Sequence, residues 1–398
     1  MRRIVKTVVV LAALALACGL AVSEAKDGEP AAGAEKKPFG LDKVIHFGYF
    51  SNPGSNYQTF VKSDDWKSCK NRGCVSTRYI THQSFLRKNV DEAANVLMNL
   101  DFKGNPDPVL TIDEFGWDYD GGIDRHCMAI LKAVHKKKPG LKIAIWQMRG
   151  PVAPKLAAVY RDTVELVFME TYYDLKNAWM IPFQLQTARL NGLLGKTVLG
   201  LGLGDENDGE HWTRTPEDLQ QQLALIRFVA PESPGVGFFG GLKGKRTGCQ
   251  ITKKQFDRIV GGFMQIPTDG SGLKPELLKL GKTFTKHYDG PAIFCSNHLM
   301  MCYFHSGFDG GPWGSLHKPR VARVLLMNLG HKDAKGVKVS LKDLKDVAKE
   351  LGSTTVDIPA RSVVVALVPG CGGWMDSATL EVDAPGGKVF NFKRKSSK

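Results

Sequence analysis

Short apolar runs alternate with amphipathic stretches through most of the chain. The apolar runs have the length of buried β-strands. They cover residues 44–50, 75–82, 108–115, 141–148, 164–170, 197–203 and 235–239, and the second has the weakest pattern. Since most of them lack an alternation of polar and apolar residues, we expect a parallel sheet that is covered on both faces.

Amphipathic segments with helical spacing lie between these runs. They cover residues 89–100, 123–138, 154–160, 175–194, 215–229 and 275–287. Thr215 is suited to the N-cap of its segment, because Pro216 follows at the first helical position and acidic residues occupy the first turn. Pro139 and Gly140 are expected to end the 123–138 helix.

Strands alternating with helices predict an α/β fold, and the chain length suits a TIM-type (β/α)8 barrel plus a smaller domain. We assign the barrel to residues 41–290. The pattern identifies seven strands, and an eighth is expected either near residues 60–80 or after Phe263. A doubly wound open sheet is the alternative, although no glycine-rich nucleotide loop follows the first strand.

The pattern changes after residue 290. Residues 321–329, 354–358 and 362–368 are β-type runs separated by turn residues. Residues 291–398 are therefore expected to form a small C-terminal antiparallel β-sandwich domain and a tail.

The first 25 residues have the pattern of an export signal. Arg2, Arg3 and Lys6 precede an apolar run at 8–17, which is too short to span a bilayer. Small residues lead up to Ala25, after which we expect cleavage. No other stretch is long and apolar enough to cross a membrane.

This pattern predicts an exported protein, periplasmic or extracellular. Lipid attachment at Cys18 is a weaker alternative, because the residues before it fit a lipobox poorly. Residues 26–40, rich in Ala, Gly, Lys and Glu, are expected to be a flexible leader.

The formal net charge of +14 falls to +12 once the three basic residues and one acidic residue of the signal are removed. A basic exported protein is suited to an anionic glycan or cell surface, and a solvated Lys-rich exterior is the plainer interpretation. The lysines are scattered, so nucleic-acid binding is not expected. No Cys or His cluster indicates a metal, no cofactor is expected, and the oligomeric state is left open. Cys127 and Cys249 have the setting of buried thiols.

Carboxylates follow two of the apolar runs, and we take Glu114 and Glu170 as the candidate catalytic residues. Polar groups at the C-terminal ends of barrel strands lie at the mouth of the barrel, where catalytic residues are found. The period of two places Glu114 on one face with Leu110 and Ile112, and Glu170 on one face with Leu166 and Phe168. Structural alternatives are a helix cap or an ion pair with Arg125 for Glu114, and an ion pair with Arg149 for Glu170.

Polar and aromatic side chains near the same strand ends are candidates for substrate binding. They are Asp113, Trp117, Gln147, Arg149, Tyr172, Tyr173, His46, Tyr49, Asp205 and Trp212. The acidic loop at 205–208 has three interpretations, namely catalytic groups, a cation site or a solvated turn.

Apolar strands that end in Glu beside aromatic residues resemble those of the barrel glycoside hydrolases as a superfamily. The resemblance covers about residues 41–290 and rests on Ile112-Asp113-Glu114-Phe115 and on Phe168-Met169-Glu170-Thr171-Tyr172-Tyr173. Neither the Asn-Glu pair of the largest retaining clan nor the acidic signature of chitinases is present, so no single family is identified.

The resemblance implies a carbohydrate substrate and cleavage of a glycosidic bond by two carboxyl groups. One carboxyl group protonates the leaving oxygen and the other acts as nucleophile or base. Glu114 is expected as acid/base and Glu170 as its partner. The alternatives are a glycan-binding barrel without catalysis and, less favoured, a polysaccharide lyase.

Overall fold

The computed structural model describes most of the chain after residue 36. The described residues are 37–47, 55–59, 67, 74–116, 122–147, 152, 154–172, 175, 178, 180–204, 213, 215–243, 248–274, 277, 293–296, 299–303, 321–328, 332–343, 346, 348–360, 362–369, 378–383 and 390–393. The expected signal at 1–25 lies outside them.

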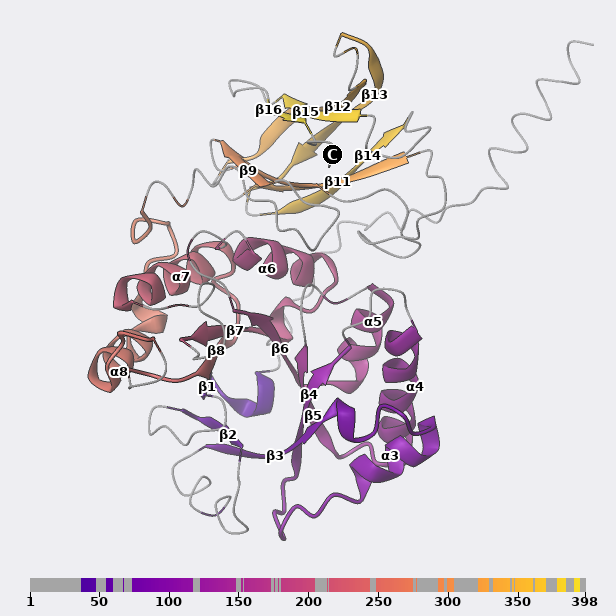
Figure 1. The fold of residues 1–398 in the computed structure, drawn as a ribbon, viewed down its shortest axis with the longest axis vertical. Helices are drawn as coiled ribbons and strands as arrows, with labels where there is room; N and C mark the ends of the chain where they lie inside the picture. The colour runs from indigo at the N-terminus through magenta and orange to yellow at the C-terminus, as the bar shows by residue number, and fades with distance from the viewer. Residues whose placement is uncertain are drawn as a thin grey trace, which may run out of the picture. The chain divides into compact units, whose positions relative to one another are not determined.

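Eight parallel strands form a closed barrel in sequence order, and β8 pairs with β1 to close it (Figure 1). The strands are β1 (Val44–Phe47), β2 (Tyr57–Thr59), β3 (Val75–Thr81), β4 (Val109–Phe115), β5 (Lys142–Gln147), β6 (Leu166–Thr171), β7 (Thr197–Leu203) and β8 (Gly235–Gly240). The predicted barrel is confirmed, and closure excludes the open sheet. The missing strand is β2, just before the 60–80 region, and its three residues are too few to produce a pattern.

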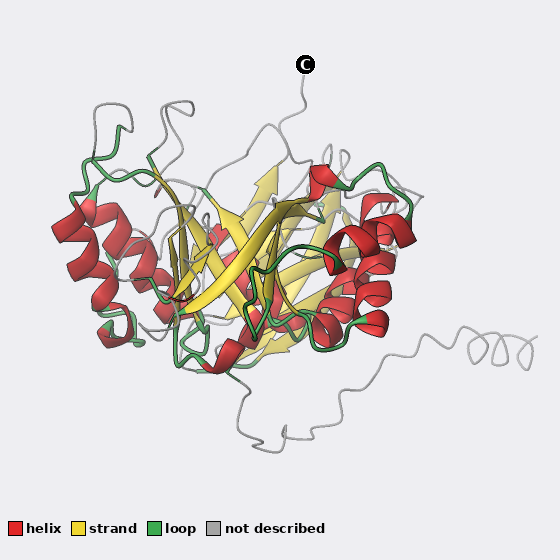
Figure 2. Ribbon diagram, turned by 90° about the horizontal axis from the view of Figure 1, so that it is seen from below, coloured by secondary structure: helices red, strands yellow, loops and turns green. Residues whose placement is uncertain are grey.

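Helices follow the strands and form an outer layer around them (Figure 2). They are α3 (Val90–Met98), α4 (Gly122–Lys137), α5 (Pro154–Thr163), α6 (Met180–Leu190), α7 (Pro216–Val229) and α8 (Lys253–Gly261). The N-cap at Thr215 is confirmed, and Asp218 completes a capping box there. Helix α8 was not predicted. The helix expected at 275–287 lies almost entirely outside the described residues.

The described helices include none with the length and apolar character that a membrane crossing needs.

Two four-stranded antiparallel sheets make up the C-terminal sandwich. One has the order β14-β11-β10-β9 and the other β13-β12-β15-β16. Their strands are β9 (Ile293–Ser296), β10 (Leu299–Tyr303), β11 (Val321–Asn328), β12 (Ala334–Asp343), β13 (Glu350–Ile358), β14 (Val363–Pro369), β15 (Ala378–Asp383) and β16 (Phe390–Lys393). The three predicted runs correspond to β11, β13 and β14. Strand β12 was missed because its apolar residues are interrupted by exposed lysines.

The barrel strands bury both faces, against two separate cores. The inner core contains Val109, Trp146 and Phe168. The outer core, between strands and helices, contains Leu110 and Ile112 of β4 together with apolar helix residues. From Val109 to Ile112, odd and even positions of β4 therefore point to opposite sides, and this alternation decides which side chains enter the barrel.

Candidate functional site

The C-terminal edge of the barrel carries acidic side chains on strands β4 and β6. Asp113 is in phase with Val109 and Thr111, which face the barrel interior. Glu170 is in phase with Leu166 and Phe168 of the inner core, as predicted. Strand β5 separates the two strands, so their backbones lie roughly 9–10 Å apart, twice the usual strand spacing.

A β-bulge interrupts β4 at its acidic residues. Ile112 pairs with Ile145 and Phe115 pairs with Gln147, so Asp113 and Glu114 together oppose a single residue of β5. Glu114 has a φ of 53°, in the left-handed region that non-glycine residues rarely adopt. Bulges and such strained residues occur often beside functional sites, where they redirect a side chain.

The prediction that Glu114 shares a face with Leu110 and Ile112 was wrong, because this bulge lies between them. Leu110, Ile112 and Phe115 all pack in the outer core, so a continued alternation would have pointed residue 114 toward the helices and Phe115 into the barrel. The extra residue instead takes Glu114 out of that outward row. The sequence pattern could not reveal this change, because a bulge is a property of the pairing between two strands.

Each acidic residue of the bulge has a partner on the preceding strand or just beyond it. The Tyr79 hydroxyl, at the end of β3, donates a hydrogen bond to Asp113 Oδ2. Gln83, in the single helical turn η2 (His82–Ser84), donates its amide to Glu114 Oε2 at 2.7 Å. Asp113, Glu114, Tyr79 and Glu170 are all half-buried, so each is partly accessible at this edge of the barrel.

Trp146 fills the barrel beneath these acids. Its ring stacks on Phe168 with centroids 4.8 Å apart and is 5% exposed. The opposite wall makes room for it, because a Cβ at Gly200 would lie 2.7 Å from the indole and a Cβ at Gly237 would lie 3.4 Å from it. The indole therefore forms an apolar floor.

Aromatic side chains also line one wall of the mouth. Trp146 Nε1 donates to the Tyr172 hydroxyl at 2.8 Å. Tyr172 stacks on Phe239, at the end of β8, with ring centroids 5.4 Å apart and planes at 23°. Both wall rings are half-buried, so each combines a packed face with an exposed part. Such a surface suits a ligand with an apolar face and polar edges.

His46 is not placed to contact a ligand, contrary to the prediction. It is 3% exposed, and its ring lies among those of Tyr57, Trp146 and Phe168 at centroid distances of 5.0–5.4 Å. Its Nδ1 donates to the Tyr57 carbonyl at 2.8 Å. Burial lowers the pKa of His46 to about 4, so the ring is neutral at neutral pH.

Gln147 also departs from its predicted role in substrate binding. It is 2% exposed and, as the residue after the inward Trp146, it points outward to the helices. Its amide donates to the Gly116 carbonyl, and the Tyr160 hydroxyl donates to its Oε1 at 2.8 Å. We therefore assign Gln147 to the packing behind the mouth.

The remaining predicted site residues lie outside the described part of the chain. They are Trp117, Arg149, Tyr173, Tyr49, Asp205 and Trp212. Their assignment to the site stays a prediction.

The structure adds Tyr79, Trp146 and Phe239 to the residues at the mouth. The period of two was a usable signal, since Tyr79 follows Val75 and Thr77 on the inward face of β3, and Trp146 follows Ala144 on β5. Within the described residues, no three His, Cys, Asp or Glu side chains gather as a metal ion would require. Cys127 and Cys249 are buried, as predicted.

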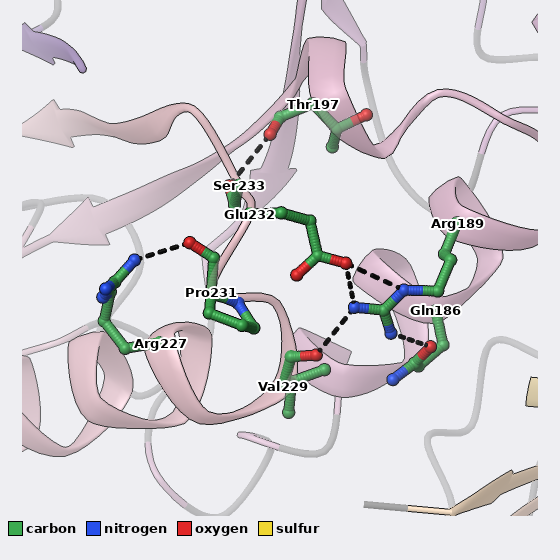
Figure 3. A network of polar contacts seen from close by, with 8 residues as sticks. All are labelled: Gln186, Arg189, Thr197, Arg227, Val229, Pro231, Glu232 and Ser233. Atoms are coloured by element: carbon green, nitrogen blue, oxygen red, sulfur yellow. Dashed lines mark hydrogen bonds and ion pairs between the residues drawn. The ribbon is translucent and has the colours of Figure 1, made fainter. Parts of the chain in front are cut away.

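The opposite, N-terminal edge of the barrel carries a different polar network (Figure 3). Arg189 of α6 donates to Glu232, to the Val229 carbonyl at 3.1 Å and to Gln186 Oε1 at 2.5 Å. Nearby, Ser233 donates to the Thr197 carbonyl at 3.0 Å. These contacts fasten the α7–β8 loop, and residues on this edge of a barrel serve stability.

No protein-family model matches the chain, and no curated protein matches it at a significant level.

Several solved structures are similar to this chain at low sequence identity. Active domain 2 of a thermostable chitinase from Pyrococcus furiosus is 12% identical, with a TM-score of 0.43, covering 58% of this chain and 98% of that chain. An endo-β-N-acetylglucosaminidase from Cordyceps militaris is 11% identical, with a TM-score of 0.42, covering 57% and 92%. A glycoside hydrolase family 5 protein from Bacteroides vulgatus is 10% identical, with a TM-score of 0.33, covering 86% and 89%.

Similarity at these identities and TM-scores does not assign an activity to this chain. The chain is a (β/α)8-barrel protein with a C-terminal β-sandwich, and the solved structures it is similar to include glycoside hydrolases.

Proposed function

We propose that this protein is a glycoside hydrolase, in which Glu114 acts as acid/base and Glu170 as its partner. One observation carries the proposal, namely that carboxylates from β4 and β6 meet the same barrel edge above an aromatic floor. Most glycosidases use a pair of carboxyl groups that flank the scissile bond. The aromatic wall of Tyr172 and Phe239 offers a stacking surface for a sugar ring.

Asp113 has a supporting role in this proposal. Tyr79 donates to one of its oxygens, so the carboxylate is held at the end of β4 beside Glu114. In that place it would accept a hydrogen bond from a sugar hydroxyl.

We also propose that the protein is exported, on the basis of the basic and apolar pattern of residues 1–25. Intact-mass measurement of the protein secreted by a bacterial host tests this. A mass that matches a chain beginning at Lys26 supports cleavage after Ala25. A mass that matches a lipid-modified chain beginning at Cys18 would overturn that cleavage site.

Activity on a panel of polysaccharides and aryl glycosides tests the catalytic proposal. Glu114→Gln and Glu170→Gln should each reduce turnover by about a thousandfold or more, while glycan binding survives. Glu165→Gln is the matched control, because Glu165 directly precedes β6 at the N-terminal edge of the barrel. If both variants turn over substrate at the wild-type rate, the assignment is overturned.

A glycan-binding protein without catalysis is the second candidate, and the stacked Tyr172–Phe239 pair favours it. It predicts glycan binding without turnover by the wild-type protein. A polysaccharide lyase would reveal itself by unsaturated products that absorb in the ultraviolet.

A further inference from the structure

Two buried glutamines bond the backbone at the ends of the strands that carry the acids. Gln147 closes β5 and is 2% exposed, and Gln184 lies on α6 and is 0% exposed. Neither side chain faces the mouth. A buried amide is costly unless both of its ends are paired, so its presence here calls for a physical reason.

Gln147 holds the chain just after the β4 bulge. Its Nε2 donates to the Gly116 carbonyl and its Oε1 accepts from Tyr160. Gly116 has a φ of 68°, and a Cβ there would lie 2.9 Å from Gln147 Oε1 and 3.0 Å from the Tyr160 hydroxyl. The segment from Glu114 to Gly116 is thus fixed from behind by close contacts on the helix side.

Gln184 repeats this arrangement on β6. Its Nε2 donates to the carbonyl of Glu170 itself at 2.9 Å. Its Oε1 accepts a hydrogen bond from the Thr171 hydroxyl. Both ends of the amide are therefore engaged by the last residues of β6.

Each of the two strand ends carries a candidate acid, Glu114 on β4 and Glu170 on β6. Glu114 has a backbone conformation that the chain does not favour, and such a residue persists only where its surroundings enforce it. A backbone carbonyl at the end of a barrel strand otherwise bonds to loop residues or water, which would leave the acid free to shift. An amide anchored in the outer core removes that freedom.

We propose that Gln147 and Gln184 are positioning residues that set the placement of Glu114 and Glu170, and so the geometry of the carboxyl pair. This inference deepens the proposed hydrolase function, on which its catalytic consequence rests. Misplacing a reacting group by about 1 Å costs up to about a hundredfold in rate. The surroundings of the two carboxyl groups depend on the placement whether or not the protein is an enzyme.

The test compares wild type with Gln147→Met and Gln184→Met, which keep the length of the side chain and remove its hydrogen bonds. With the aryl glycoside that the wild type cleaves, kcat should fall about tenfold to a hundredfold while KM stays within about threefold. With 13C-labelled glutamate, the carboxyl 13C NMR signals of Glu114 and Glu170 should shift from their wild-type positions, because the surroundings of both groups change.

Gln186→Met is the matched control. Gln186 is a fully buried glutamine on the same helix as Gln184, but its oxygen accepts from Arg189 in the network at the N-terminal edge (Figure 3). This variant should lose stability and leave kcat and both carboxyl NMR signals unchanged. If the methionine variants do not fold, Tyr160→Phe and Thr171→Val each remove one hydrogen bond to a glutamine and should lower kcat about threefold to tenfold.

The outcomes separate the two proposals. Unchanged kcat and unchanged carboxyl NMR signals in the Gln147 and Gln184 variants would overturn the positioning role while leaving hydrolysis intact. Equal shifts in Gln186→Met would also overturn it. Shifted carboxyl NMR signals in a protein that cleaves no glycoside would support the positioning role and overturn hydrolysis.

Discussion

The indole N–H of Trp146, on β5, donates at 2.8 Å to the hydroxyl of Tyr172, which directly follows the neighbouring strand β6. This bond ties the apolar floor formed by Trp146 to the aromatic wall of the mouth. Because Trp146 is almost fully buried and Tyr172 stacks on Phe239, the three rings form one unit. A substitution at any of the three should therefore change both the free energy of unfolding and the affinity for a ligand, and the two changes can be measured separately.

Tyr172→Phe removes only the hydroxyl. It should lower the free energy of unfolding by about 1 kcal/mol, because the indole N–H loses this acceptor in a buried setting. The ring stays, so affinity for an oligosaccharide that the wild type binds should change less than about threefold. Tyr172→Ala removes the ring and should weaken that affinity about tenfold or more. Urea denaturation and calorimetric titration measure the two effects, and similar affinities for the Phe and Ala variants would contradict the stacking role.

Gly200→Ala should destabilise the barrel by about 1–3 kcal/mol. The new methyl group would lie 2.7 Å from the Trp146 ring, which is packed on Phe168 and has little room to move. Gly261→Ala provides the control, since nothing lies within 4 Å of a Cβ at that helical position and alanine favours a helix. Chemical denaturation curves compare the two, and the contact is refuted if Gly200→Ala is as stable as wild type.

Stability should decrease as the pH is lowered, because of His46. Burial lowers its folded-state pKa to about 4 from 6.5, so the unfolded chain binds more protons between these values. The contribution is fully present above about pH 6.5 and is lost progressively toward pH 4, by about 3 kcal/mol in total. Burial lowers the pKa of His82 to about 4 as well, which adds to the same trend.

His46→Phe should flatten this dependence by about 1.4 kcal/mol per pH unit within that window. The Tyr57 carbonyl keeps a hydrogen bond from Ser55, at 2.8 Å, so the substitution leaves it paired. His135→Gln, at an exposed helix position, should leave the slope unchanged. Urea unfolding at several pH values gives the slopes, and identical slopes for wild type and His46→Phe would rule out this cause.

The backbone of Glu114 should reveal its strain through a pair of substitutions. Residue 114 has a φ of 53°. An alanine at this position therefore keeps the energetic penalty of the left-handed region, whereas a glycine does not. Glu114→Gly should therefore be about 1 kcal/mol more stable than Glu114→Ala. At Lys142, in regular strand β5, the order should reverse. A Glu114→Ala protein more stable than its glycine counterpart would mean that the backbone is unstrained.

The linear pattern was sufficient for most of the elements that surround the site. Runs of apolar residues marked the barrel strands, because a strand covered on both faces must be apolar along its length. Thr215 marked the start of α7, because a cap depends only on residues close in sequence. The acids at the ends of β4 and β6 were found in the same way, from a polar residue that follows an apolar run.

Pairing between distant strands decided the rest. The bulge at Asp113 and Glu114 exists only in the register of β4 against β5, and it changed the direction of a candidate acid. Strand β2 is too short to signal itself, and it became visible only as the strand that links β1 to β3.

The sequence by itself determined the fold class and the strand ends at which acidic side chains occur, since both follow from local hydrophobic periodicity. The tertiary structure alone decided that Trp146 fills the space above Gly200, that His46 is sealed beneath it and that Gln147 lies behind the mouth. These placements depend on closure of the barrel, which brings together side chains from strands far apart in the chain, and no local pattern encodes those contacts.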